Sequence, residues 1–212
     1  MLQRQLICSL NLLHPVSQAY ESFIEQERPF YFRTIKKGTL ILVPGKKGNE
    51  LHFVCKGFFI LYCYDDRGEE QVLELFWENT FIMIPVQFYD GTDNEQYYIR
   101  AIEDAQLLSI SNTKMDIIHD LFPESRIHID RIRSRITLRT IHHLLLLLRQ
   151  KEERYSEFVS FYKIVAARLT EYLTSSYLGV CIKTLNRAKQ AKKPKIRTFV
   201  LYIIGLLSYF FA

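Results

Sequence analysis

The sequence predicts a mixed α+β protein, in which an N-terminal jelly roll (a double-stranded β-helix) is followed by a long helix and a small C-terminal helical region. Three patterns support this prediction. Short apolar runs separated by turn residues fill the segment from Phe30 to Ser111. An apolar stripe at helical spacing runs through residues 124–151, and two short helical patterns flank a glycine between residues 155 and 190.

The strand-like segment contains six runs rich in Ile, Val, Phe and Tyr. In order they are TLILV, LHFVC, FFILYCY, QVLELF, QYYIRAI and QLLSI. Turn residues such as Pro44-Gly45 and Asp90-Gly91 separate them, and glycine supplies the positive φ that tight connections need. Many short strands with this punctuation are typical of a sandwich, a jelly roll or a small barrel.

The hydrophobic period changes after residue 112. Lys114 to Leu121 predicts a short helix, and Glu124 to Lys151 is long enough for about seven helical turns. Such a long apolar stripe must be covered, either by the chain's own β domain or by the same helix of a second subunit. We predict a homodimer, with these residues in its interface: Ile129, Ile132, Ile136 and Leu147.

Two other features of the long helix are predicted to serve packing. The five consecutive residues Leu144 to Leu148 are apolar on all sides, but about 20 apolar residues are needed to span a bilayer. His142 and His143 lack a third ligand at suitable spacing, so a role in packing or in an interface is favoured over metal binding.

Residues 170–190, TEYLTSSYLGVCIKTLNRAKQ, show the pattern of a helix-turn-helix. An apolar helix end is followed by a three-residue turn that begins with Gly179, and then by a basic helix with Leu185 on its inner side. Ser175 stands where the two helices would approach closely, which requires a small side chain. The pattern favours a DNA-binding function.

The distribution of charge supports a polyanionic partner. The formal net charge is +5, but residues 181–212 contain seven basic residues and no acid, which leaves −2 on the other 180 residues. Concentrated Lys and Arg are what binding to nucleic acid or to an anionic membrane requires, whereas a solvated basic tail is the simpler alternative.

Several classes of protein are disfavoured. The sequence shows no nucleophile–base pair, no glycine-rich phosphate loop and no spaced metal ligands, so we predict no enzyme, no metal and no cofactor. The four scattered cysteines form no CxxC motif, which argues against zinc and iron–sulfur sites, and are expected to be buried and reduced. The N-terminus shows no export cleavage site, so the cytoplasm is the predicted location.

The order of these parts resembles the Crp/Fnr family of transcription regulators, particularly the form common in Bacteroidetes. The specific matches are KKGTLILVPGKKGNELHFVCKGFFILYCYDDRGEEQVLELF, YYIRAIEDAQLLSIS, EERY at 152–155, and SSYLGVCIKTLNRAKQ. The resemblance runs from about His14 to Gln190. It implies a cyclic-nucleotide-binding-like sensor domain at 14–120, a dimerisation helix at 121–151 and a DNA-binding domain at 152–197, and it leaves an apolar tail at 198–212.

The resemblance also locates a ligand pocket. Family members that bind a cyclic nucleotide have a Gly-Glu pair and, about eleven residues later, an Arg that holds the phosphate. Here Met83 and Ile84 replace the pair, and Glu95 stands where the arginine is expected, so its carboxylate would repel a phosphate. We therefore expect no response to cyclic nucleotides. The pocket around Phe81, Met83, Ile84 and Glu95 is either filled or admits a different, apolar effector.

The resemblance places the DNA contacts on the second helix of the helix-turn-helix. Cys181 takes the N-cap position, where Ser or Thr is usual, and Ile182 a position that often reads a base. Five side chains are expected to contact double-stranded DNA, at bases (Lys183, Asn186, Arg187) and at phosphates (Thr184, Lys189). A dimer would read a palindromic site. The alternative is a β-domain ligand-binding or protein-interaction module whose helix pair no longer binds DNA.

The C-terminus departs from the family pattern. After Ala191 the chain continues as KKPKIRTFVLYIIGLLSYFFA, a basic cluster followed by an apolar, aromatic segment. Three interpretations remain open. The tail packs on the protein, contacts a membrane surface, or is an altered C-terminus of a gene whose ancestor ended near Gln190.

Overall fold

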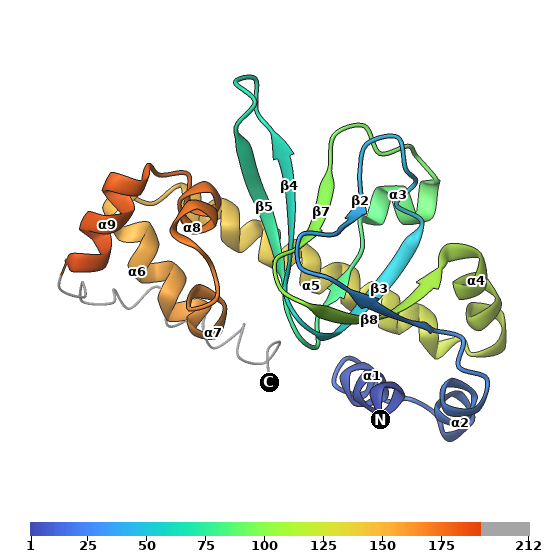
Figure 1. Cartoon of the computed structure of the whole chain (residues 1–212). Coiled ribbons are helices and arrows are strands. Elements are labelled where there is room, and N and C mark those ends of the chain that lie inside the picture. The colour runs from blue at the N-terminus through green and yellow to red at the C-terminus, as the bar shows by residue number, and fades with distance from the viewer. Residues whose placement is uncertain (192–212) are drawn as a thin grey trace. The chain divides into compact units, whose positions relative to one another are not determined.

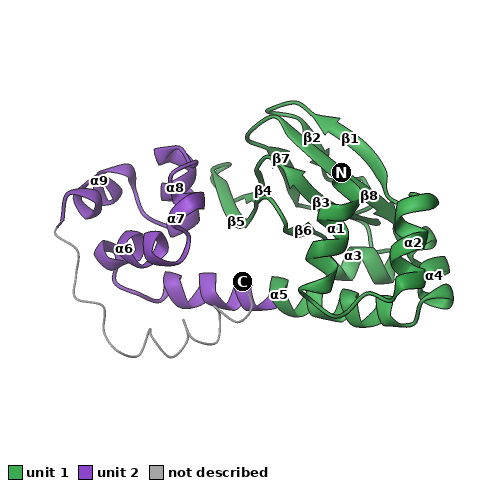
Figure 2. Ribbon diagram, turned by 90° about the horizontal axis from the view of Figure 1, so that it is seen from below, with its two compact units in different colours: residues 1–136 green, residues 137–212 purple. Residues whose placement is uncertain are grey.

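A computed structural model describes residues 1–191 of the chain. The chain divides into two compact units, residues 1–136 and residues from 137 onward, and each is considered by itself (Figure 2). One long helix, α5 (Glu124–Leu147), ends the first unit and begins the second.

The first unit is a β-sandwich with helices on one side (Figure 1). Its strands are β1 (Tyr31–Ile35), β2 (Leu40–Leu42), β3 (Glu50–Lys56), β4 (Phe59–Tyr64), β5 (Glu70–Phe76), β6 (Phe81–Ile82), β7 (Tyr98–Ala101) and β8 (Ala105–Ser111). Sheet A has the order β1-β8-β3-β6 and sheet B the order β2-β7-β4-β5, with antiparallel neighbours throughout. The helices are α1 (Leu2–Asn11), α2 (Gln18–Gln26), α3 (Pro85–Asp90), α4 (Asn112–Leu121) and the first part of α5.

Alternation along the strands of sheet A produces two cores. Residues such as Phe53 and Leu108 face α1, α2, α4 and α5, and form with them a large apolar cluster. Residues such as Val54 and Leu107 point the other way and meet sheet B in a second cluster between the sheets. Sheet A is therefore buried on both faces.

The predicted fold is confirmed as a mixed helix-and-sheet protein with a β-sandwich and a long helix. Each of the six apolar runs contains a strand, β2, β3, β4, β5, β7 and β8 in order. The short helix expected at Lys114 to Leu121 is α4, which begins two residues earlier with Ser111 as its N-cap. The long helix ends at Leu147 rather than at Lys151, where a new helix begins.

The second unit is helical in its described part. It contains the end of α5, α6 (Lys151–Phe161), α7 (Lys163–Ala166), α8 (Glu171–Leu178) and α9 (Ile182–Gln190), with α6 packed along α9. His143 stacks on Tyr177 with ring centroids 3.8 Å apart, and His142 lies against Phe161 at 4.2 Å. The prediction that the two histidines serve packing is therefore confirmed.

The cysteines are all free, and only Cys55 is buried. The expectation of buried thiols was wrong for Cys8 and Cys181, which lie on exposed parts of their helices or caps. Within residues 1–191, the search for helices with the length and hydropathy needed to cross a membrane found none.

Candidate functional site

The connection between α8 and α9 is a sharp turn made possible by Gly179. This glycine has φ 58° and ψ 41°, the left-handed conformation that favours glycine at a helix end. The Val180 N–H donates to the Ser175 carbonyl at 3.0 Å, and the Gly179 N–H donates to the Ser176 carbonyl at 3.1 Å. This paired arrangement satisfies the last carbonyls of α8 and redirects the chain into α9.

Helix α9 begins at a weak N-cap. Cys181 is the N-cap residue, and its side chain forms no capping hydrogen bond to the backbone. Its Sγ lies 3.3 Å from the Thr184 hydroxyl, and this contact, together with backbone N–H groups at the helix start, lowers the pKa of the thiol. Leu185, fully buried, anchors the helix to the rest of the unit, as predicted.

The five predicted DNA-contact residues differ in their exposure and in whether they already form an ion pair. Lys183 and Arg187 are exposed, lie four residues apart on α9, and form no ion pair with any residue in the described part of the chain. Lys189 donates to Glu171 at 2.8 Å, which lowers the pKa of that carboxyl group. Thr184 and Asn186 are half-buried. The available cationic side chains of α9 are therefore Lys183 and Arg187.

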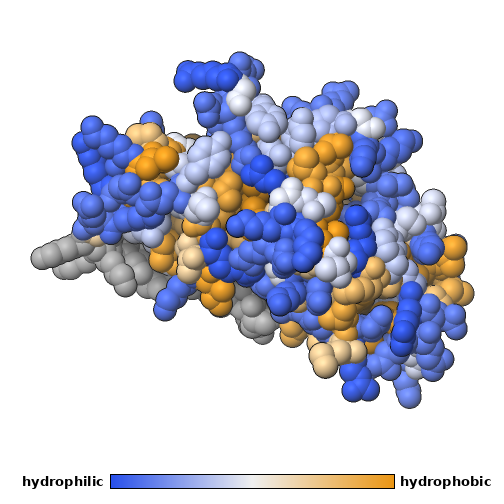
Figure 3. Space-filling view, in the orientation of Figure 1, coloured by the Kyte–Doolittle hydropathy of each residue, from blue (hydrophilic) through white to orange (hydrophobic). Residues whose placement is uncertain are grey.

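The surface over α9 is mostly hydrophilic, with a small hydrophobic patch beside it (Figure 3). Ile182 is the exposed large apolar residue of this helix, with 45% of its surface accessible. The basic residues Lys192, Lys193 and Lys195, the end of the predicted DNA-binding domain and the apolar tail 198–212 lie outside the described residues.

A second candidate site lies between the two sheets of the first unit. It is a cavity of about 30 Å³, enough for one or two water molecules. The lining residues are Ile41, Leu42, Lys47, Gly48, Glu50, His52, Ile82, Met83, Ile84 and Ile99. Of the predicted pocket residues, Met83 and Ile84 line this cavity. Phe81 instead packs against Phe53, with ring centroids 5.1 Å apart, and Glu95 is exposed; neither lines the cavity.

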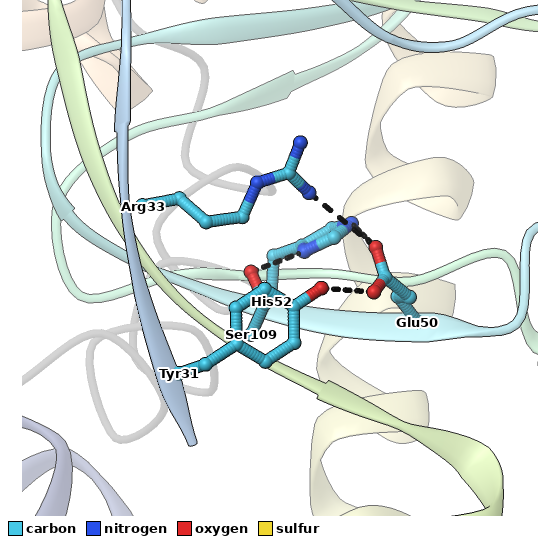
Figure 4. Close-up of polar contacts among 5 residues, drawn as sticks. All are labelled: Tyr31, Arg33, Glu50, His52 and Ser109. Carbon is cyan, nitrogen blue, oxygen red and sulfur yellow. Dashed lines mark hydrogen bonds and ion pairs between the residues drawn. The ribbon is translucent and has the colours of Figure 1, made fainter.

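A polar cluster borders the cavity on the inner face of sheet A (Figure 4). Nδ1 of His52 lies 2.8 Å from the hydroxyl of Ser109, directly across the β3–β8 pairing. The Glu50 carboxylate accepts from the Tyr31 hydroxyl and pairs with Arg33 at 3.4 Å. Nε2 of His52 lies 3.9 Å from Glu50. Three strands, β1, β3 and β8, thus bring five polar side chains together.

Burial controls the protonation of this cluster. Desolvation lowers the pKa of His52 to about 4, against a smaller opposing effect of the Glu50 carboxylate, so the imidazole is neutral near pH 7. Burial and the bond to Glu50 raise the pKa of Tyr31. The sequence did not predict this cluster. The sequence contains one indication of the cluster. Polar residues, Glu50 and His52 in particular, occupy alternate positions of an otherwise apolar strand and therefore lie on the same face of the sheet.

The sequence of the β-sandwich matches a known domain family. Residues 32–120, from β1 to α4, match the cyclic nucleotide-binding domain family. The β-sandwich therefore resembles a cyclic nucleotide-binding domain. A comparison with curated proteins found no match.

Solved structures resemble the β-sandwich together with the helices that follow it. FixK2 from Bradyrhizobium japonicum has a TM-score of 0.67 at 15% identity, covering 76% of this chain and 83% of that one. A Crp/Fnr family protein from Eubacterium rectale scores 0.64 at 15% identity, covering 82% of each chain. CLP of Xanthomonas campestris, a global regulator that responds to c-di-GMP, scores 0.64 at 17% identity, covering 80% and 89%. The predicted resemblance to Crp/Fnr proteins is confirmed in the fold, and the Bacteroidetes form stays a prediction.

The four residues predicted for a dimer interface face their own chain. Ile129 and Ile132 are 3% and 2% exposed and pack under the β-sandwich, with Ile136 at the edge of the same core. Leu147 is half-buried and faces Gly179. Other large apolar residues in the second half of α5 and just after it are exposed, namely Ile141, Leu144, Leu145 and Leu148.

Proposed function

We propose that this chain is a DNA-binding transcription regulator of the Crp/Fnr type, a cytoplasmic homodimer that does not respond to cyclic nucleotides. The observation that carries the proposal is the α8–turn–α9 unit with Lys183 and Arg187 exposed on its second helix. We propose a sensor domain at 14–120, a dimerisation helix at 121–151, a DNA-binding domain at 152–197 and no enzymatic activity.

In this proposal α9 is the helix that enters the major groove. Residues in its first two turns reach base edges in such docking, and an arginine is well suited to the two acceptors of a guanine. Lys183 and Arg187 take these roles, together with Asn186. Thr184 contacts a phosphate. Lys189 contributes less than the sequence suggested, because Glu171 already neutralises it.

The dimer interface is proposed along the exposed apolar stripe that follows the second half of α5 and ends at Leu148, one residue after the helix. Leu138, Ile141, Leu145 and Leu148 follow the three- and four-residue spacing of a helix-to-helix seam, and Leu144 flanks it. Ile141, Leu144, Leu145 and Leu148 have between 42% and 82% of their surface accessible. Ile129 and Ile132 serve instead to hold α5 against sheet A.

The size and lining of the cavity support independence from cyclic nucleotides. Ligand pockets have volumes of roughly 300–1,000 Å³, whereas this cavity measures about 30 Å³. Met83 and Ile84 present apolar side chains where a phosphate would need donors. A cyclic nucleotide would therefore require both a larger cavity and different residues.

The test is binding-site selection with the purified full-length protein, followed by gel shifts on the selected duplex. Alanine at both Lys183 and Arg187 is expected to weaken binding to the selected duplex by about 10-fold or more, since base contacts are each worth about 1–3 kcal/mol. Alanine at both Lys151 and Lys163, exposed lysines of α6 and α7, removes the same charge away from α9 and serves as the control.

Selection of a palindromic duplex and a loss confined to the α9 variant would support the proposal. Equal binding by all three proteins would contradict it. A stable dimer that retains no duplex at low salt would favour the alternative, a β-domain ligand-binding or protein-interaction module.

A further inference from the structure

Strand β1 is an open edge of sheet A. It pairs with β8 along one side, in an unbroken register over its five residues from Tyr31 to Ile35. Within residues 1–191, the backbone of β1 forms no hydrogen bond with any other strand or loop. Because alternate residues of a strand direct their N–H and C=O groups to opposite sides, the outer side of β1 presents free backbone donors and acceptors.

The next strand in the chain, β2, is the edge of sheet B and is less regular. Its register with β7 shifts between Leu40 and Leu42. An irregularity of this kind bends an edge strand and disfavours pairing with a further strand. Of these two edges, β1 is therefore the one that can be extended by another strand.

The side chains of β1 differ between its two faces. Tyr31 and Arg33 point from the strand toward Glu50 (Figure 4). By alternation, Phe32 lies on the opposite face, and half of its surface is accessible. A strand added beside β1 would place alternate side chains next to Phe32 on one face and next to Arg33 on the other. The edge therefore suits a strand that is apolar on one face and charged on the other.

The segment that contains β1 is strongly basic. Residues 28–49 include no acidic residue and six basic ones: Arg28, Arg33, Lys36, Lys37, Lys46 and Lys47. Glu50 and Asp104 each pair with one of them, at 3.4 Å and 3.1 Å. The other four form no ion pair in the described part of the chain, and two of these, Arg28 and Lys37, are exposed close to the two ends of β1. A partner at this edge must therefore be acidic.

Charge also distinguishes between the possible partners. A second copy of the chain, paired through its own β1, would bring like charges together, which destabilises strand pairing. A DNA duplex would satisfy the basic side chains, but it has no peptide backbone that could continue the sheet, and it would leave Phe32 exposed. An acidic polypeptide strand satisfies the charges, the free backbone groups and the apolar side chain together.

We propose that β1 binds an extended acidic segment of a partner protein, which adds to the four-stranded sheet A as a fifth strand. Backbone hydrogen bonds to β1 supply much of the affinity, and the side chains supply the specificity. Acidic residues of the segment lie near Arg28, Arg33 and Lys37, and apolar residues at alternate positions pack beside Phe32. This interaction does not depend on the DNA-binding function proposed above.

The experiment measures binding of a fluorescent nonapeptide of alternating valine and glutamate to the full-length protein by fluorescence polarisation. Saturable binding is expected, and its affinity is expected to fall as salt is added, because salt screens exposed charges. Two control peptides are expected to bind at least about 10-fold more weakly. One replaces glutamate by lysine, and the other keeps every side chain but has N-methylated backbone amides, which cannot donate to a neighbouring strand.

Backbone amide hydrogen exchange, followed by NMR, locates the bound peptide. The valine–glutamate peptide is expected to slow the exchange of alternate amides in residues 31–35, namely those that do not bond to β8. The amides of Phe53 and Val54 in β3 are expected to stay unchanged. Strand β3 already has β8 on one side and β6 on the other, so it offers no free edge.

Substitutions test the charges and the apolar contact separately. The double variant Arg28→Glu and Lys37→Glu is expected to bind the valine–glutamate peptide at least about 10-fold more weakly at low salt. Arg67→Glu with Lys114→Glu makes the same change of charge at exposed residues of the β4–β5 turn and of α4, and is expected to bind normally. Phe32→Ser is expected to weaken binding about 3-fold without changing the salt dependence.

Several results would overturn the proposal. These are binding of either control peptide as tight as that of the valine–glutamate peptide, unchanged binding by the Arg28 and Lys37 double variant, and slowed exchange at amides outside β1. If the double variant loses affinity for a random-sequence DNA duplex as strongly as for the peptide, the edge is a nucleic-acid surface instead. The peptide experiments contain no DNA, so their failure leaves the gel-shift result untouched, and a chain that fails to bind DNA can still bind the peptide.

Discussion

The protonation of His52 couples the stability of the first unit to pH. Its pKa falls from 6.5 in the unfolded chain to about 4 in the folded one, mainly because burial disfavours the charged form. The unfolded chain therefore binds more protons between these values, so the stabilisation is present above pH 6.5 and is lost as the pH falls toward 4. We expect the free energy of unfolding to fall by roughly 2 kcal/mol on this account between pH 7 and pH 5.

Urea titrations followed by tryptophan fluorescence measure this effect. Trp77 is the single tryptophan of the chain and belongs to the first unit. His119 and His128 in the same unit also have pKa values lowered by burial, so the comparison is with His52→Phe, which retains them. The variant is expected to show a shallower loss of stability on acidification. An identical pH dependence in both proteins would contradict the assignment.

Some functional residues could be predicted from sequence and others could not. Exposure of Lys183 and Arg187 follows from the pattern of α9, in which Leu185 is the inward residue. The neutralisation of Lys189 depends on Glu171, 18 residues earlier in the chain, and no local pattern contains that pairing. The His52 cluster joins residues up to 78 positions apart, so it exists only once β1, β3 and β8 are paired.

The turn between α8 and α9 is the element whose geometry most directly supports the proposed function. Gly179 adopts φ 58°, and a Cβ there would lie 3.2 Å from Arg154 Nη1 and 3.3 Å from Leu147 Cδ2. Gly179→Ala is expected to destabilise the second unit by about 1–2 kcal/mol, because an L-residue with a Cβ pays for the left-handed conformation. Thermal unfolding followed by far-ultraviolet circular dichroism measures the loss.

Asparagine is the matched control at this position. Gly179→Asn introduces the same Cβ contacts, but asparagine tolerates the left-handed conformation better than alanine does. Its cost is therefore expected to be smaller. Equal destabilisation by Ala and Asn would show that crowding against Arg154 and Leu147, rather than backbone conformation, requires the glycine.

At the scale of elements, the strands with a clear alternation of apolar and polar residues could be predicted from the sequence, and the elements without a clear period could not. The six apolar runs became strands because alternation over several residues determines which face is buried. Strand β6 has only two residues, Phe81–Ile82, and so carries no period. Helix α3 begins at Pro85, two residues beyond the end of β6, and ends at Gly91, which adopts the left-handed conformation. Neither of the N-terminal helices α1 and α2 was predicted.

At the scale of the whole molecule, the sequence predicted the long helix α5 but not which of its faces is exposed. Helix α5 carries one apolar stripe that includes Ile129 and Ile132 and a second that includes Ile141 and Leu145. The first is covered by sheet A and α1 and α2 of the same chain. The periodicity of the sequence indicates that an apolar stripe must be buried. Only the three-dimensional packing shows whether the stripe is buried by the same chain or left exposed for a partner.

The exposed stripe provides the test of the proposed dimer. Replacing Leu144 and Leu148 by Arg places two charges in an apolar seam, so the dimer is expected to dissociate at concentrations where the unmodified protein stays paired, as measured by analytical ultracentrifugation. Leu121→Arg, at an equally exposed leucine of α4, is the control and is expected to leave the dimer intact. The monomeric variant is expected to lose its preference for a palindromic duplex over a half-site, because only a dimer presents two α9 helices to one duplex. A variant that stays dimeric would place the interface elsewhere.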